Sequence, residues 1–247
     1  MDNPFSEFKW TQTFGYGKYT FTFAEIRDLL ISALVLGLIF TFGNWSLKNF
    51  FMSIGIVGPA LILHELAHKF VAQKYDLVAA YVMWPTGIAI ALLVAFMTQG
   101  SMIFAALGAV MIAPVYHTRL GYKFIGLTST ELGKISIAGP LTNLVIAIIS
   151  YLMIPLNPEF FLMSANINCW IALFNCIPIP PLDGTKIFRW NIPLWMGVFT
   201  ATIVLMFLPA YIGVLLSVVI SIILLVIIFI VMQLIMPVGQ QSATEFK

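Results

Sequence analysis

Charged residues are scarce in this chain of 247 residues. Lysine, arginine, aspartate and glutamate make up 9% of it, whereas hydrophobic residues make up 61%. Soluble domains carry about 25% charged residues, so this chain could not cover a water-exposed surface with polar groups. Several stretches reach the roughly 20 apolar residues that are needed to cross a bilayer. The composition therefore excludes a soluble enzyme or binding module and predicts a multi-pass integral membrane protein.

Cysteine and net charge are low as well. Cys169 and Cys176 are the two cysteines, and their spacing fits neither a CxxC motif nor a disulfide framework. We expect both to be small buried side chains. The net charge of +2 gives no reason to expect a nucleic-acid partner. Because no repeat or soluble domain is visible, we expect one membrane-embedded domain over residues 1–247.

Six apolar stretches predict membrane-spanning helices and an all-α membrane fold. They are residues 29–42, 50–70, 135–154, 160–177, 192–208 and 212–236. Between the second and third stretches lie two apolar pieces, 88–97 and 103–116, each of which is short for a full crossing. These pieces predict a membrane-associated β-hairpin or a re-entrant insertion. The Val, Ile and Gly content around residues 108–115 favours a strand there.

Lysine and arginine are unevenly distributed between the two sides of the membrane that these predicted spans would cross. If the N-terminus is inside, eleven of the twelve fall on the inner side, and only Lys48 falls outside. Cytoplasmic loops carry such an excess of positive charge. The distribution therefore predicts that both termini are cytosolic, together with the inner end of the second helix.

The stretch LILHELAHKF, residues 61–70, places two histidines and a glutamate in a span that is otherwise fit for lipid. His64 and His68 are four residues apart, so on a helix they share a face and can bind one zinc ion. Glu65 is then beside the metal, where it can take a proton from water. Ionisable groups inside a membrane span are costly and mark functional sites. The motif therefore predicts a zinc site with a general base, rather than a packing role.

A catalytic zinc needs a third protein ligand, and the chain offers four candidates. His117 lies among basic residues that are typical of a solvated loop, Glu131 is placed to cap a helix, and Cys176 is unremarkable. Asp183 lies in FNCIPIPPLDG, where prolines break a helix and a glycine permits a sharp turn. Irregular backbone at membrane depth is tolerated where it lines a polar cavity. Since the charge distribution also places this turn on the side of the two histidines, we favour Asp183.

Three asparagines lie in the predicted spans. Asn175, eight residues before Asp183, can donate a hydrogen bond to a substrate carbonyl that becomes an oxyanion. Asn168 shares the helix face of Asn175, and Asn143 lies in AGPLTN on the preceding helix. An amide in lipid must find a partner, so binding to a neighbouring helix is the alternative role of each. For Asn175 we favour the catalytic role.

Taken together, HELAH, AGPLTN and LFNCIPIPPLDG make residues 50–189 resemble the site-2 protease family of intramembrane zinc metalloproteases. The resemblance implies one zinc ion per chain, bound by His64, His68 and Asp183. It implies Glu65 as the catalytic acid and base, and Asn175 as a substrate-orienting or oxyanion-binding group. It also implies six helices, an active site nearer the cytosolic face, and transmembrane proteins as substrates.

Many members of that family carry a PDZ or CBS domain, and no stretch of this chain is long enough for one. This compactness fits a prokaryotic cell-membrane enzyme. An unwound substrate could add as a strand to an exposed edge at 108–115. The alternative function is a zinc transporter or a non-catalytic metal-binding membrane protein, because transporters also place His and Asp at helix breaks. A transport site, however, needs no general base beside its histidines, and no inverted repeat is visible.

Overall fold

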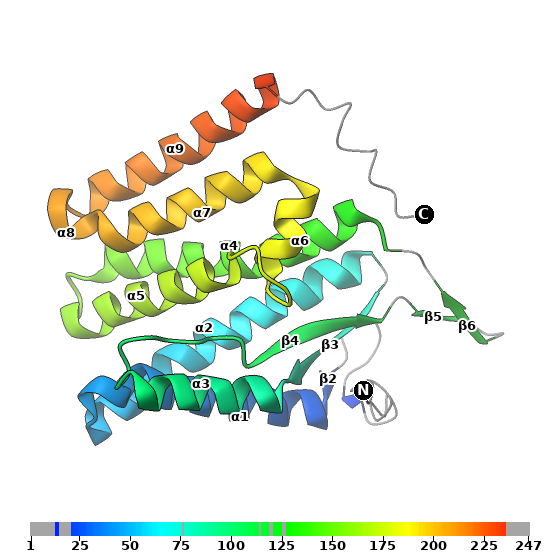
Figure 1. The fold of residues 1–247 in the computed structure, drawn as a ribbon, viewed down its shortest axis with the longest axis horizontal. Helices are drawn as coiled ribbons and strands as arrows, with labels where there is room; N and C mark the ends of the chain where they lie inside the picture. The colour runs from blue at the N-terminus through cyan, green and yellow to red at the C-terminus, as the bar shows by residue number, and fades with distance from the viewer. Residues whose placement is uncertain are drawn as a thin grey trace.

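Helices form most of the computed structural model, which describes residues 13–14, 21–75, 77–113, 115–118, 121–124 and 127–235. The long helices are α1 (Phe23–Thr41), α2 (Leu47–Lys74), α4 (Ser129–Met153), α5 (Pro158–Asn175), α7 (Ile192–Phe207) and α9 (Val214–Ile235). The short ones are η1 (Phe42–Asn44), α3 (Pro85–Met97), α6 (Asp183–Trp190) and α8 (Pro209–Ile212). The long helices are stacked in order, from α1 through α2, then α4 and α5, to α7 and α9 (Figure 1).

In the part of the chain that the structure describes, three segments are long and apolar enough to cross a membrane, namely Phe23–Asn44, Leu47–Lys74 and Ser129–Met153. They contain the first two predicted spans and all but the last residue of the third, so the structure supports a membrane protein. The remaining predicted spans, 160–177, 192–208 and 212–236, overlap α5, α7 and α9. Among the described residues only the three named segments meet the criterion for crossing, so six crossings stay a prediction.

Three antiparallel strand pairs add to the helices within the described ranges, so this part of the chain is mostly helical rather than purely α. The pairs are β1 (Thr13–Phe14) with β2 (Phe21–Thr22), β3 (Val78–Met83) with β4 (Gly108–Ala113), and β5 (Val115–Thr118) with β6 (Gly121–Phe124). The strand preference around 108–115 is thus confirmed for Gly108–Ala113, and residue 114 lies outside the described ranges.

Residues 88–97, for which we considered short strands, lie instead in helix α3. Pro85 is the first residue of α3, where its fixed φ and missing N–H suit the start of a helix. The 13 residues of α3 span about 20 Å at 1.5 Å per residue, less than the roughly 30 Å hydrocarbon core. A membrane insertion by this segment stays a prediction.

The ends of two helices place the later motifs beside α2. At the start of α4, Thr128 and Glu131 form a capping box, so Glu131 is a helix cap, as we expected. After α5 the chain turns back into α6, and a Cβ at Gly184 would overlap the carbonyl of Cys176. A glycine is therefore required for this turn to pack against the end of α5. Cys176 and Cys169 are both free and buried.

Candidate metal centre

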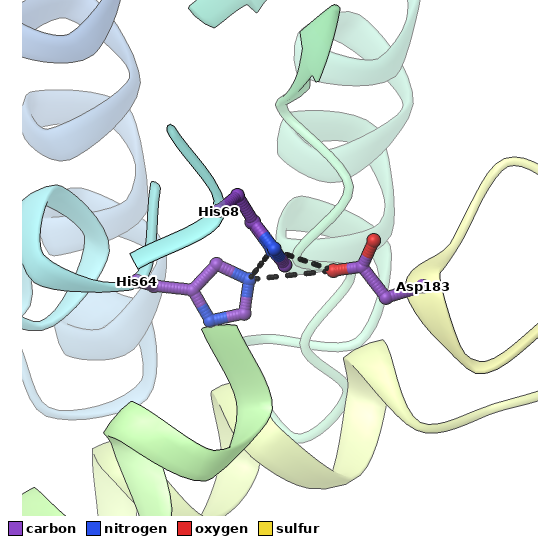
Figure 2. A group of neighbouring side chains, drawn as sticks. All are labelled: His64, His68 and Asp183. Carbon is purple, nitrogen blue, oxygen red and sulfur yellow. Dashed lines mark hydrogen bonds and ion pairs between the residues drawn. The ribbon is translucent and has the colours of Figure 1, made fainter. Parts of the chain in front are cut away.

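His64 and His68 project from one face of α2 toward Asp183, the first residue of α6 (Figure 2). The two Nε2 atoms lie 3.1 Å apart. Asp183 Oδ2 lies 2.8 Å from His68 Nε2 and 3.6 Å from His64 Nε2. Within the described part of the chain, this is the group of His, Cys, Asp or Glu side chains that could hold a metal ion. The structure thus brings the three predicted ligands together.

The outer nitrogen of each ring has a partner that sets the ring's orientation. His64 Nδ1 donates to Asn143 Oδ1, and His68 Nδ1 donates to the carbonyl of Ile135 at 2.7 Å. With both protons held on Nδ1, both Nε2 lone pairs face the Asp183 carboxylate. The three lone-pair-bearing atoms, which are the two Nε2 atoms and Asp183 Oδ2, repel one another unless a cation lies between them. In a tetrahedral zinc site with bonds of about 2.1 Å, donor atoms are about 3.4 Å apart, so the group fits one zinc ion.

Asn143 holds His64 through a chain of buried amides. Its Nδ2 donates to the carbonyl of Ala60 at 3.2 Å and to Asn168 Oδ1 at 2.9 Å. Oδ1 therefore remains as the acceptor for His64. Asn168 in turn donates to the carbonyl of Ser164 at 2.9 Å. Both asparagines thus bind neighbouring groups, the alternative that we gave for them, and Asn143 also orients a candidate metal ligand.

Glu65 opens onto the same space as the histidines. It is buried, and no described residue gives its Oε2 a hydrogen-bond partner. A mostly apolar cavity of about 560 Å³ is lined by His64, Glu65, His68, Asn175, Asp183 and residues 108–112 of β4. A carboxylate oxygen without a partner beside a metal-binding group is suited to accept a proton from water.

Asn175 lies on the wall of this cavity near the end of α5. Its Nδ2 donates to the carbonyl of Ile171 at 2.9 Å, which fixes the direction of the amide. A side-chain amide carries two N–H donors, so one remains for a ligand in the cavity. The structure therefore places all five predicted site residues around one cavity.

Lys186 and Gly139 also belong to the site, although the sequence motifs indicated a role for neither residue. Lys186 Nζ lies 3.3 Å from Asp183 Oδ1, the oxygen that is turned away from the histidines. The three-residue spacing from Asp183 on a helix is the signal that could have indicated Lys186.

Gly139, in the AGPLTN motif, lies against the two rings. A Cβ at this position would overlap the Nε2 atoms of both His64 and His68. The absence of a side chain on this turn of α4 therefore leaves room at the metal-facing atoms. The motif that supplies Asn143 to hold one ring thus also supplies the space in front of both rings.

A His/His/Asp group that could hold a metal ion, next to a buried glutamate in a protein with apolar helices of membrane-crossing length, fits a metal-dependent hydrolase. A protein of Methanocaldococcus jannaschii, named "Putative zinc metalloprotease MJ0611", is 36% identical over 183 residues, which cover 72% of this chain and 90% of that protein. The Bacillus subtilis protein named "Putative zinc metalloprotease YwhC" is 30% identical over 147 residues, which cover 53% of this chain and 64% of that protein.

No protein-family profile matches the chain, and no solved structure matches it significantly. The first relative nevertheless shares more than a third of its aligned residues over most of its length. The chain therefore belongs to this family of zinc metalloproteases, and zinc is the metal that its His/His/Asp group fits.

Proposed function

We propose that this protein is an intramembrane zinc endopeptidase of the site-2 protease type, which hydrolyses peptide bonds in transmembrane segments of other proteins. One observation carries the proposal. The His64, His68 and Asp183 group and the buried Glu65 share an apolar cavity with strand β4. The histidines and Glu65 lie on a helix that is long and apolar enough to cross a membrane.

Glu65 supplies the proton transfers of the proposed reaction. Zinc, when bound, supplies a Lewis acid and lowers the pKa of water to about 7. Glu65 takes the proton of the attacking water and returns it to the leaving amine. Asn175 donates its free N–H to the carbonyl oxygen on which negative charge develops. The apolar cavity wall keeps other water away, which strengthens both interactions.

The edge of β4 provides a place for the substrate. A transmembrane helix must unwind before its peptide bonds reach the cavity, and its freed backbone groups then need partners. Among the described strands β4 pairs with β3 alone, and residues 108–112 of β4 line the cavity. An extended substrate segment that adds to β4 satisfies these groups.

The membrane topology is part of the same proposal. The positive-inside distribution supports a multi-pass protein with both termini and the active-site end facing the cytosol. The relatives from Methanocaldococcus jannaschii and Bacillus subtilis support a prokaryotic cell membrane. Substrates then reach the cavity from the lipid, while water reaches it from the cytosol.

Glu65→Gln tests the proposed reaction. The variant keeps the volume of the side chain and removes the base, so we expect about one zinc ion per chain and cleavage that falls roughly 10²- to 10⁴-fold. Wild type and variant are reconstituted with a single-helix membrane substrate, and the products are measured by mass spectrometry. Equal cleavage by both rules out the role of Glu65. Zinc uptake by wild-type vesicles without cleavage supports the transporter instead.

A further inference from the structure

Glu25, in the first turn of α1, lies buried where three elements meet. Its carboxylate accepts two hydrogen bonds from Lys69 Nζ of α2, at 2.8 Å and 2.6 Å. Oε1 also accepts from the backbone N–H of Tyr81 in β3, at 3.2 Å. Both charged side chains are 2% exposed, and Lys69 Nζ lies 3.8 Å from the centre of the Phe21 ring. One carboxylate thus joins α1, α2 and β3.

Stability alone does not account for this buried pair. Taking two charges out of water costs about as much as their attraction returns, and apolar replacements of similar volume are often equally stable or more so. Lys69 directly follows His68 in the sequence. The pair therefore connects the strand β3 to the residue next to a candidate metal ligand.

A second carboxylate repeats the contact one helical turn later. Asp28 Oδ2 accepts from the backbone N–H of Met83 at 3.2 Å, and Ser32 Oγ accepts from the Tyr81 hydroxyl at 2.9 Å. Glu25, Asp28 and Ser32 lie on one face of α1. Tyr81 and Met83 are two residues apart, so their N–H groups point to the same side of β3. This face of α1 thus provides hydrogen-bond acceptors for the outer edge of β3, as a neighbouring strand would.

The register of the β3–β4 pair shows which strand edge remains available for hydrogen bonding. Tyr81 pairs with Val110 and Met83 with Gly108. The N–H groups of Tyr81 and Met83 point away from β4. The Tyr81–Val110 and Met83–Gly108 pairs are therefore the non-hydrogen-bonded pairs of the antiparallel ladder. The backbone groups of Val110 and Gly108 therefore also point away from β3, on the outer edge of β4.

We propose that Glu25 and Asp28 are positioning residues for the cleavage reaction. They close the outer edge of β3, so that an extended substrate adds at β4, and they fix β4 relative to the metal centre. The distance from β4 to the metal centre then selects the peptide bond that is cut. This inference rests on the proposed proteolytic function.

Two double variants separate the hydrogen bond to β3 from the ion pair. Glu25→Gln with Lys69→Met removes both charges and keeps an amide oxygen for the Tyr81 N–H. Glu25→Leu with Lys69→Met removes the same charges and also the acceptor. For each we measure bound zinc, kcat, KM and the cleavage position in a single-helix membrane substrate.

We expect the Gln variant to cut the wild-type bond with a KM within about twofold of wild type. An unpaired buried N–H costs about 1–3 kcal/mol. We therefore expect the Leu variant to raise KM roughly 5- to 160-fold and to cut neighbouring bonds as well. Both variants keep about one zinc ion and a similar kcat, because the metal ligands and Glu65 are unchanged. Should the Leu variant yield no zinc-loaded protein, Asp28→Asn and Asp28→Leu make the same comparison at Met83.

Two results overturn the inference. One is cleavage of the same bond with the same KM by both members of a pair. The other is a Leu variant that yields less zinc-loaded protein but cuts the wild-type bond with the wild-type KM, which marks a merely structural role. Equal cleavage by wild type and Glu65→Gln refutes the proposed function instead, and the inference with it.

Discussion

The metal centre and the β3–β4 pair face the same cavity but are built in opposite ways. At the metal centre, the outer nitrogens of His64 and His68 and the outer oxygen of Asp183 all have partners within the chain. In the strand pair, β3 is hydrogen-bonded on both sides, whereas β4 has one partner strand among those described.

This difference assigns a separate task to each region. A hydrogen bond to the outer atom of a metal ligand fixes the direction of the atom that faces the metal, and a metal site depends on that direction. A strand edge next to a cavity has unpaired backbone groups, and these are the groups that bind an extended peptide. The metal centre, which we call the closed region, is therefore suited to hold the reacting atoms. The outer edge of β4, which we call the open region, is suited to hold the substrate. Variants can separate the two tasks.

Gly139→Ala has the largest expected effect on the closed region. The added methyl group would overlap the metal-facing nitrogens of His64 and His68, so we expect bound zinc to fall from about one ion per chain to near zero and cleavage to be lost. Gly55→Ala is the matched control, because a Cβ at this α2 position meets nothing within 4 Å. It gains about 1 kcal/mol in helix propensity and keeps zinc. A zinc-loaded Gly139→Ala protein would contradict the metal position.

Asn143→Leu is expected to lower the zinc affinity of the metal centre without changing a metal ligand. The variant removes the acceptor that orients the His64 ring, and loss of such a partner costs about 10- to 100-fold in metal affinity. Zinc affinity is measured by competition with a chelator of known strength. Asn168→Leu keeps the contact between His64 and Asn143 and changes affinity less. Equal losses in the two variants would show that the buried amides act through packing alone.

The sequence predicted the metal group because its information is local. HELAH fixes two ligands within one helical turn, and a helix break followed by Asp and Gly indicates the third. The first three membrane-length segments follow from apolar composition over a long stretch. Helix α3 was harder to predict, because a short apolar piece suits a strand and a buried helix equally well.

The contacts around the site could not be predicted in the same way. Glu25 and Lys69 are 44 residues apart, and Asn143 lies 79 residues from His64. No periodicity links such pairs, since they meet only when helices pack. Gly139 illustrates the same limit, because its importance depends on two rings that belong to another helix. The sequence thus predicted the ligands, whereas tertiary packing determines what orients them.

Val110→Pro has the smallest expected effect and acts on the open region alone. The register places the Val110 N–H on the outer edge of β4, so proline removes one donor to the substrate and leaves the ladder to β3 in place. One hydrogen bond is worth about 0.5–1.5 kcal/mol, so we expect kcat/KM to fall roughly 2- to 12-fold with zinc unchanged. Val110→Ala, which keeps the N–H, is the control. If Val110→Pro cleaves as fast as Val110→Ala at full zinc occupancy, the substrate does not pair with β4, and its freed backbone must bind elsewhere in the cavity.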